Sequence, residues 1–495
     1  MSVGAQQEHD YAVVIGLEVH VQLETETKIF CSCSTDFADS PPNTHTCPVC
    51  LGLPGALPVL NEAVVEAAIK LGKAIDATVP EFSEFHRKNY FYPDLPKNFQ
   101  ITQYDSPICA DGTLEIQIED TTRTIAIERA HLEEDPGRLT HAGGSIATAD
   151  HTLVDYNRAG VPLMEIVTAP DFRSPAETRA FLAKLEEVLE YLDIFDSNRD
   201  GSLRVDANIS LVPSNAIDTE GTIPQAALEN ANRTEVKNIS SHKGAERALA
   251  YEVTRQRNQL RRGGEIQQET RHWDESRGVT VSLRTKEGEA DYRYFPEADL
   301  PALSVADWVS KIEIPELPEA RRDRFQTDYD MNEEMARKLT SSRDVADFFE
   351  AIVANYDPQT AATWVADNIV GELNYREMEL EEVTHRLDEF ERLIELVVAD
   401  EITVKNAEEV VLRTMLDTGD DPDTIIEREE LGTSGEAEVQ RAVQAAIETN
   451  EAAVADYHAG ESEALNYLVG QVMQATEGRA EPGTVNTLLQ EALDE

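Results

Sequence analysis

Hydrophobic and polar residues alternate strictly in the stretch Val13–Glu24, whose sequence is VVIGLEVHVQLE. Its odd-numbered positions are apolar, and its even-numbered positions from Gly16 onward are glycine or polar. A period of two is typical of a β-strand with one face in the core. Glu18 and His20 should therefore point to the same open side, roughly 7 Å apart. Such a pair could bind a divalent cation or move a proton, and a solvated outer face is the alternative.

The same alternation recurs along the chain in residues 113–132, 201–213 and 279–285, and the short stretch RTEVKNIS adds charged positions of its own. The polar positions of these segments include Arg204, Asp206, Glu235 and Lys237. The recurrence favours a shared, buried role for these charges over a solvated face. It predicts one curved, largely antiparallel sheet, whose polar side is a basin of carboxylates edged by arginine and lysine.

Three consecutive acids, Glu133, Glu134 and Asp135, stand where the second alternating segment ends, directly before Pro136-Gly137. Neighbouring carboxylates repel one another unless a cation or solvent relieves the repulsion. These three acids are therefore added to the predicted basin. Arg158 and Glu165 follow beside a Gly-Val-Pro turn.

Helical patterns flank these strands and dominate the second half of the chain. Asn61 is an expected N-cap for a helix through Ile75, and Ser174-Pro175-Ala176-Glu177 predicts a capped helix that reaches about Leu192. From about Pro318 the pattern is helical without strand alternation. We therefore predict an α+β fold: a mainly antiparallel β cradle with flanking helices (1–300), an all-α helical domain (301–400) and an all-α tail domain (401–495).

Four of the five cysteines form two close pairs separated by 13 residues of loop-like sequence. Five cysteines in 495 residues do not make a disulfide framework. In a reducing cytosol the spacing predicts a structural zinc site with four thiolate ligands, and four free or oxidised thiols are the alternative. The predicted ligands are Cys31, Cys33, Cys47 and Cys50.

The composition is strongly acidic, with a formal net charge of −52, and lysine is scarce beside arginine. This balance favours a halophilic source over an ordinary acidic protein, because concentrated counter-ions screen the self-repulsion. An RNA-binding protein in such a cell cannot depend on phosphate electrostatics, which salt weakens steeply. The chain has no apolar run that could span a bilayer and no signal-peptide pattern, so we expect a cytoplasmic protein.

Eight motifs stand in order along nearly the full length of the chain. They begin with IGLEVHVQLETETKIFC and the two cysteine pairs, the second within CPVCLGLPGALPVLN. The aromatic and cationic stretch RKNYFYPDLPKNFQI follows. This stretch could contact the end of a nucleic acid or a phosphate, and rigid packing of the loop is the alternative. The remaining motifs are HLEEDPGRL, DYNRAGVPLMEIV, GSLRVDANIS, EVKNISS and DYRYFPEADLP. With these eight motifs the chain resembles a known family, the B subunit of the tRNA-dependent aspartyl/glutamyl amidotransferase.

The resemblance implies that the chain uses ATP to phosphorylate the side-chain carboxylate of Asp-tRNA(Asn) or Glu-tRNA(Gln). Ammonia from a glutaminase A subunit then displaces phosphate, and a small C subunit completes a heterotrimer. It also implies zinc on the cysteine pairs, Mg²⁺ in the basin and charged tRNA on the tail. The expected catalytic residues are Glu18, His20, Glu133, Glu134, Asp206 and Glu235, the first four also as Mg²⁺ ligands. Phosphate oxygens of ATP would be held by Arg158, Arg204 and Lys237.

Two other function classes stay open at this point. A stand-alone metal-dependent ligase or phosphohydrolase acting on a small acid would have a similar basin, but it has no use for a helical tail. A non-catalytic RNA-binding protein would not bury repelling carboxylates. The sequence contains no Walker-type phosphate loop and no kinase signature, so ATP binding follows from the resemblance alone.

Overall fold

The computed structural model describes residues 11–119, 121–142, 149–199, 201–216, 223–285, 292–459 and 461–494. The chain divides into two compact units, one ending at Pro318 and the other beginning at Glu319. Among the described residues, no helix combines the length and the apolar character needed to cross a bilayer.

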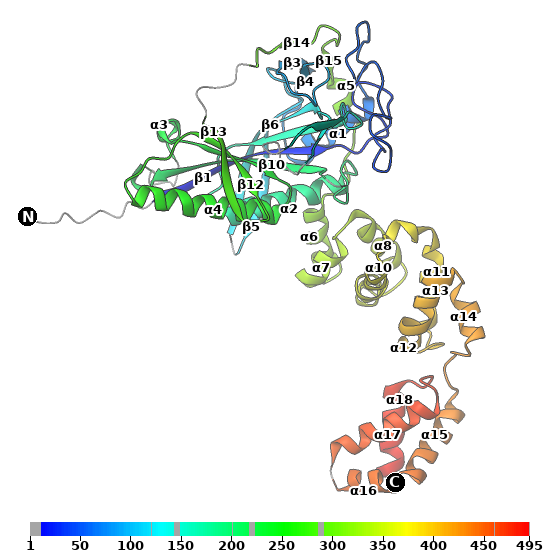
Figure 1. Ribbon diagram of the computed structural model, residues 1–495. Helices are drawn as coiled ribbons and strands as arrows, with labels where there is room; N and C mark the ends of the chain where they lie inside the picture. Colours follow the sequence, from blue (N-terminus) through cyan, green and yellow to red (C-terminus); the bar gives the residue numbers. More distant parts are fainter. Residues whose placement is uncertain are drawn as a thin grey trace, which may run out of the picture. The chain divides into compact units, whose positions relative to one another are not determined.

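The N-terminal unit is built on a sheet of eight described strands in the order β13-β12-β11-β10-β1-β9-β6-β5. Several of these strands, among them β1, β6 and β10, are labelled in Figure 1. All neighbouring strands are antiparallel except β11 and β12, which are parallel. This arrangement confirms the predicted mainly antiparallel cradle. The strands are β1 (Tyr11–Gln22), β5 (Cys109–Ile118), β6 (Thr121–Glu134), β9 (Pro162–Thr168), β10 (Leu203–Pro213), β11 (Thr234–Ile239), β12 (Glu269–Asp274) and β13 (Val279–Thr285).

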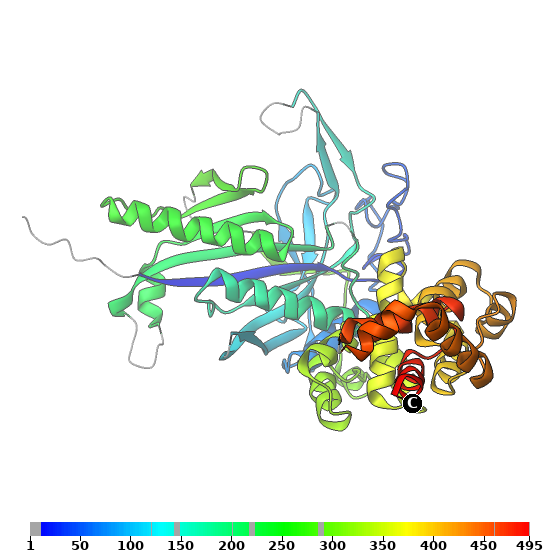
Figure 2. The same cartoon turned by 90° about the horizontal axis from the view of Figure 1, so that it is seen from below.

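Strand β1 lies inside the sheet between β10 and β9, and its apolar positions are buried in one large hydrophobic cluster. The same cluster contains residues of α1 (Glu62–Ala74), α2 (Pro175–Tyr191) and α4 (His242–Arg261), so these helices cover the apolar face. Helices α2 and α4 contact each other and run alongside β1 when seen from below (Figure 2). The even-numbered side chains of β1 are left for the opposite, polar face.

Both predicted helix starts are confirmed. The Asn61 side chain accepts a hydrogen bond from the backbone N–H of Ala63, and Ser174 accepts one from Glu177 at the start of α2. The Glu177 carboxylate accepts from the backbone N–H of Arg173 at 2.6 Å, so it satisfies a donor just before the cap. These side chains supply partners for backbone groups that a helix end leaves open.

Shorter pieces complete the N-terminal unit. A three-stranded sheet has the order β14-β3-β4, and two-stranded ribbons pair β15 with β2 and β7 with β8. The small three-stranded sheet carries Lys88 on β3. The bounds are β2 (Phe82–Ser83), β3 (His86–Asn89), β4 (Phe99–Thr102), β7 (Arg138–His141), β8 (Thr152–Asp155), β14 (Phe295–Pro296), β15 (Leu303–Ser304), α3 (Gln225–Asn230) and α5 (Ala306–Val309).

The second unit is helical throughout its regular structure in the described residues, and the α+β assignment is thereby confirmed. Its buried residues form one cluster from Phe325 to Ile425 and another from Val439 to Leu493. The division of this half at residues 300 and 400 stays a prediction. The helices are α6 (Pro318–Asp328), α7 (Glu333–Leu339), α8 (Arg343–Val353), α9 (Pro358–Ala362), α10 (Val370–Arg376), α11 (Leu387–Val398), α12 (Val404–Asn406), α13 (Arg413–Thr418), α14 (Pro422–Arg428), α15 (Glu436–Thr449), α16 (Glu451–His458), α17 (Ser462–Ala475) and α18 (Pro482–Asp494).

Candidate active site and metal-binding clusters

A row of polar side chains crosses neighbouring strands on the polar face of the sheet. His131 of β6 is paired in register with Glu165 of β9, and Glu165 is paired with His20 of β1. The Nε2 atoms of both histidines lie 3.5 Å from Oε2 of Glu165, and Nε2 of His20 lies 3.8 Å from Oε1 of Glu133. His20, Glu133 and Glu165 thus form a first cluster, whose three ligand atoms lie within 4.8 Å of one another.

The first cluster is buried and strongly polarised. Burial alone would lower the pKa of His20, but hydrogen bonding to Glu165 and the charges of Glu165 and Glu133 raise it to about 9. Burial would raise the pKa of Glu165, but the imidazoles of His131 and His20 hold it well below its usual range. Burial raises the pKa of Glu133. The opposite directions of these two pKa shifts favour an ion pair between His20 and Glu165, whose Nε2 and Oε2 atoms are 3.5 Å apart.

A second cluster joins three acids from three adjacent strands. Glu18 of β1 is paired with Asp206 of β10, and Glu235 of β11 follows one strand further along. Their ligand atoms also lie within 4.8 Å of one another. Asn208 donates a hydrogen bond to Oε1 of Glu18 at 3.1 Å, and the Thr270 hydroxyl donates to Oε2 of Glu235 at 2.8 Å. Burial and then the charge of Glu165 raise the pKa of Glu18.

Two lysines bring positive charge to these acids. Lys237 forms a close ion pair with Asp206, and its Nζ lies 3.1 Å from Oε1 of Glu235. Lys88 comes from the small sheet, and its Nζ lies 5.3 Å from the ring centroid of Tyr292. Burial would lower the pKa of Lys88, but the charges of Glu133 and Glu165 raise it. Both ammonium groups therefore stay charged beside the carboxylates.

Arg204 and Arg158 both form ion pairs with Asp135, which belongs to neither cluster. Arg204 donates to Oδ1 of Asp135 at 2.7 Å, and Gln22 donates to Oδ2 at 2.7 Å. Arg158 donates to the carbonyl oxygens of Pro136 and Gly137 at 3.0 and 2.8 Å, and its Nε lies 3.6 Å from Asp135. The two arginines thus hold the turn after β6.

Glu134 lies apart from both clusters. Successive side chains of a strand point to opposite faces, so Glu134 is turned away from the face that carries Glu133. Its carboxylate accepts a hydrogen bond from the backbone N–H of Ile101 at 2.9 Å and forms a close ion pair with Lys97. These contacts attach β4 to the end of β6.

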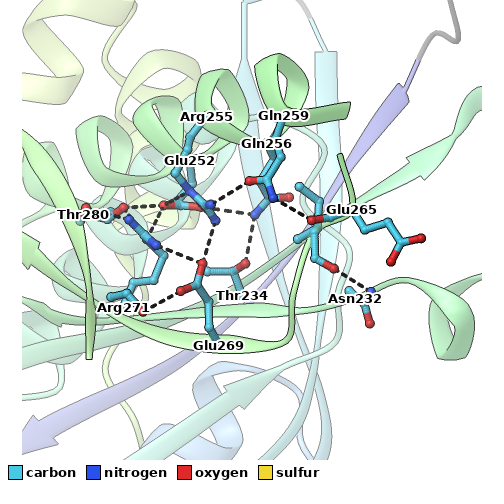
Figure 3. A network of polar contacts seen from close by, with 12 residues as sticks. Asn232, Thr234, Glu252, Arg255, Gln256, Gln259, Glu265, Glu269, Arg271 and Thr280 are labelled. Carbon is cyan, nitrogen blue, oxygen red and sulfur yellow. Dashed lines mark hydrogen bonds and ion pairs between the residues drawn. The ribbon is translucent and has the colours of Figure 1, made fainter. Parts of the chain in front are cut away.

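A buried ionic network between α4 and β12 fixes the strand that orients Glu235 (Figure 3). Glu252 of α4 is fully buried, and its carboxylate lies 2.8 Å from Arg255 and 3.1 Å from Arg271 of β12. Arg271 also lies 2.9 Å from Glu269. Thr270, whose hydroxyl donates to Glu235, directly precedes Arg271 in β12. The network therefore holds this part of β12 against α4.

The two cysteine pairs come together in the loop after β1. Their four Sγ atoms lie within 4.8 Å of one another, and Sγ of Cys50 is 3.8 Å from Sγ of Cys47. A tetrahedron with Zn–S bonds of about 2.3 Å has edges of about 3.8 Å. The backbone N–H of Cys47 also donates to the Cys50 sulfur at 3.1 Å. The donor set fits a tetrahedral zinc ion.

Comparison with known proteins bears on the whole chain. Residues 13–311 match the family described as the GatB/GatE catalytic domain, and residues 347–493 match the one described as the GatB domain. The B subunit of the aspartyl/glutamyl-tRNA(Asn/Gln) amidotransferase from Natronomonas pharaonis is 68 % identical over 495 residues, which is all of both chains. The chain belongs to this B-subunit family.

Other B subunits of the same name match the chain over almost the same length. That of Halobacterium salinarum is 67 % identical over 487 residues, or 98 % of both chains. That of Methanospirillum hungatei is 52 % identical over 491 residues, covering 98 % of this chain and 99 % of the relative. The resemblance inferred from the eight sequence motifs is therefore confirmed.

The structure brings most of the expected residues of this B-subunit chain to the polar face, although their metal-binding roles remain predictions. It divides them into two groups, with Glu18 in one and His20 in the other. Sequence reasoning did not count Glu165 or Lys88 among the site residues. Glu165 stands in PLMEIV, where every side chain is buried, so no alternation marks it. Its register with His20 and His131 could not be read from one sequence.

Proposed function

We propose that this chain is the B subunit of an aspartyl/glutamyl-tRNA(Asn/Gln) amidotransferase and carries its carboxylate-activating site. It uses ATP to phosphorylate the side-chain carboxylate of misacylated Asp-tRNA(Asn), Glu-tRNA(Gln) or both. Ammonia supplied by the glutaminase A subunit then replaces the phosphate, which yields Asn-tRNA(Asn) or Gln-tRNA(Gln). The observation that carries this proposal is the pair of partly buried carboxylate clusters on one face of a sheet in a chain of this family.

The donor atoms of the two clusters suit a hard divalent cation such as Mg²⁺, because carboxylate oxygens predominate and one imidazole joins them. Bound cations of this kind neutralise and align phosphate oxygens during phosphoryl transfer. His20, Glu133 and Glu165 would hold one cation, and Glu18, Asp206 and Glu235 would hold another. Glu133, Glu165 and Glu235 are buried, whereas Glu18, His20 and Asp206 are partly exposed, so the clusters can be reached from solvent by ATP and substrate.

The cationic side chains have distinct proposed tasks. Lys237 and Lys88 carry charged ammonium groups next to the acid clusters, where they would hold ATP phosphate oxygens or the carboxylate of the substrate. Arg204 and Arg158 keep the turn after β6 in place through Asp135 and the neighbouring carbonyls. The sequence predicted that both arginines hold phosphate oxygens. To do so, their guanidinium groups would have to reach the clusters in addition to making these contacts.

The proposal includes an assembly and a location. The chain would act in the cytoplasm as part of a heterotrimer with the A and C subunits, and residues 401–495 would bind charged tRNA. The four cysteines would hold a structural zinc ion. The acid-rich composition of the chain and its similarity to the relative from Halobacterium salinarum support a halophilic source.

The deciding experiment measures ADP release and amide formation with purified charged tRNA, ATP, glutamine and the A and C subunits. Wild-type protein should form the amide on Asp-tRNA(Asn), on Glu-tRNA(Gln) or on both, and Glu18→Gln should abolish it. Glu115→Gln, on the exposed side of β5, is the matched control and should retain activity. A rate of ATP turnover that is the same with and without charged tRNA would instead favour a ligase or phosphohydrolase acting on a small acid. Binding of tRNA without ADP release would favour a non-catalytic RNA-binding role.

A further inference from the structure

Lys28 is a lysine in an unusual position, because its side chain is completely buried. Its ammonium group donates hydrogen bonds to the carbonyl oxygens of His45 at 2.7 Å and Tyr156 at 3.5 Å. Within the described residues it forms no ion pair with a carboxylate. A buried charge without a directly paired counter-charge is unfavourable, so a net negative charge close to this residue would stabilise it.

The four-cysteine site lies directly beside Lys28. A Cβ atom built on Gly160 would lie 3.5 Å from Cδ of Lys28, 3.5 Å from Cβ of Cys50 and 4.0 Å from Oε2 of Glu134, so the three side chains border the same glycine. The Glu134 carboxylate is already ion-paired with Lys97, which leaves the cysteines as the uncompensated anions beside Lys28. The backbone N–H of Lys28 also donates to the carbonyl oxygen of Cys33 at 3.0 Å. The lysine therefore reaches the site through both its backbone and its side chain.

Four thiolates carry more negative charge than one Zn²⁺ ion can neutralise. We propose that Lys28 is the charge-compensating residue of the four-cysteine site, whose ammonium offsets the excess negative charge of the zinc-loaded thiolates. The lysine and the site thus stabilise each other, because each supplies the counter-charge that the other lacks in a buried environment. This inference rests on the proposed zinc site and does not depend on the proposed amidation.

The hydrogen bonds of Lys28 also explain why a long side chain with several N–H donors suits this buried position. His45 lies in the loop between the cysteine pairs, and Tyr156 precedes Asn157, whose side chain accepts from the His45 N–H at 2.8 Å. Asn157 further donates to the Pro41 carbonyl at 2.9 Å. Lys28 thus joins the cysteine loop to the segment before Arg158, with its charge fixed by two carbonyl oxygens.

The test replaces Lys28 and measures zinc affinity by competition with a chromophoric chelator. Lys28→Gln removes the charge and keeps an N–H donor, whereas Lys28→Met removes both. Residues that support metal ligands from outside the coordination shell typically change affinity about 10–100-fold, so we expect a weakening of this size in both variants. Lys73→Met is the matched control, since Lys73 also donates to a backbone carbonyl, that of Ile312. It should leave zinc affinity unchanged.

A double-mutant cycle separates charge from packing. Cys33→His lowers the negative charge of the site by replacing a thiolate with a neutral imidazole. Charge compensation predicts that Lys28→Gln weakens zinc binding less in the Cys33→His background than in wild type. Additive effects would overturn the proposal, and so would an unchanged zinc affinity in either Lys28 variant. Failure of both variants to fold in excess zinc would indicate a packing role and would also reject it.

Discussion

The buried network of Figure 3 gives a stability prediction that can be worked out in detail. Glu252→Gln keeps the shape of a side chain that is fully buried and removes the charge that faces Arg255 and Arg271. Breaking a buried ion pair from one side usually costs about 3–5 kcal/mol, because a buried charge is left uncompensated. Glu269 still lies 2.9 Å from Arg271 and 3.3 Å from Arg255, so some compensation remains. We therefore expect a loss near the lower end, about 3 kcal/mol.

The matched control stands on the same helix. Glu246 pairs with Arg179 at 3.2 Å, and their side chains are 33 % and 49 % exposed. Exposed pairs contribute about 0–1 kcal/mol, and salt screens them further. Glu246→Gln should thus change stability little in molar KCl, whereas the effect of Glu252→Gln should persist.

The assay is urea unfolding in high salt, followed by hydrogen exchange of peptides from α4 and β12. This readout is local, so it separates the N-terminal unit from the helical unit. Equal free energies of unfolding for the Glu252→Gln and Glu246→Gln variants would refute the reasoning. Such a result would mean that the network contributes no more than an exposed pair.

Further predictions concern the metal sites, the tail and pH. His20→Ala should abolish amide formation with the A and C subunits while thermal melting still shows a folded chain; near-normal activity would exclude the basin as the phosphorylation site. In Mg²⁺-free protein, protonated His20 should stabilise the fold fully below pH 6.5, and this contribution should vanish as the pH rises through about 9; identical pH profiles for wild type and His20→Ala would contradict this. Deleting 401–495 should raise KM for charged tRNA without affecting ammonia release by the A subunit, and an unchanged KM at high salt would count against a tRNA-binding tail. Metal analysis should find one zinc ion per chain and no titratable thiols in the native state at the expected ligands Cys31, Cys33, Cys47 and Cys50.

Periodicity in the sequence predicted β1 and β10 and the helices that begin at Asn61 and Ser174, but it joined β5 and β6 into one segment and did not mark β9, which carries Glu165. Alternation places Glu18 and His20 on one face, and the caps at Asn61 and Ser174 begin helices as expected. Partners across strands could not be predicted, because register depends on long-range pairing rather than on local pattern. This is why Glu18 and His20 were expected to share one cation, although the fold gives each its own acidic neighbours.

Glu134 illustrates a second reason. Three adjacent acids in a sequence look equivalent, but a strand sends neighbours to opposite faces. Glu133 thus joins the basin while Glu134 receives an amide hydrogen bond from β4. The partners of Glu134 come from distant parts of the chain. A single sequence therefore does not show whether such an acid binds a metal or holds two strands together.

The opposite orientations of Glu133 and Glu134 have a consequence for how this chain can change during evolution. A deletion of one residue near the end of β6 would exchange the two faces, which would turn a carboxylate to the wrong side and bring Leu132 out of the core. A register shift between Ile127 and Arg129 already interrupts the pairing of β6 with β9. Insertions or deletions in β6 should therefore be tolerated only on the N-terminal side of Ile127. There the irregular pairing can take up a change in length without altering the register at Glu133 and Glu134.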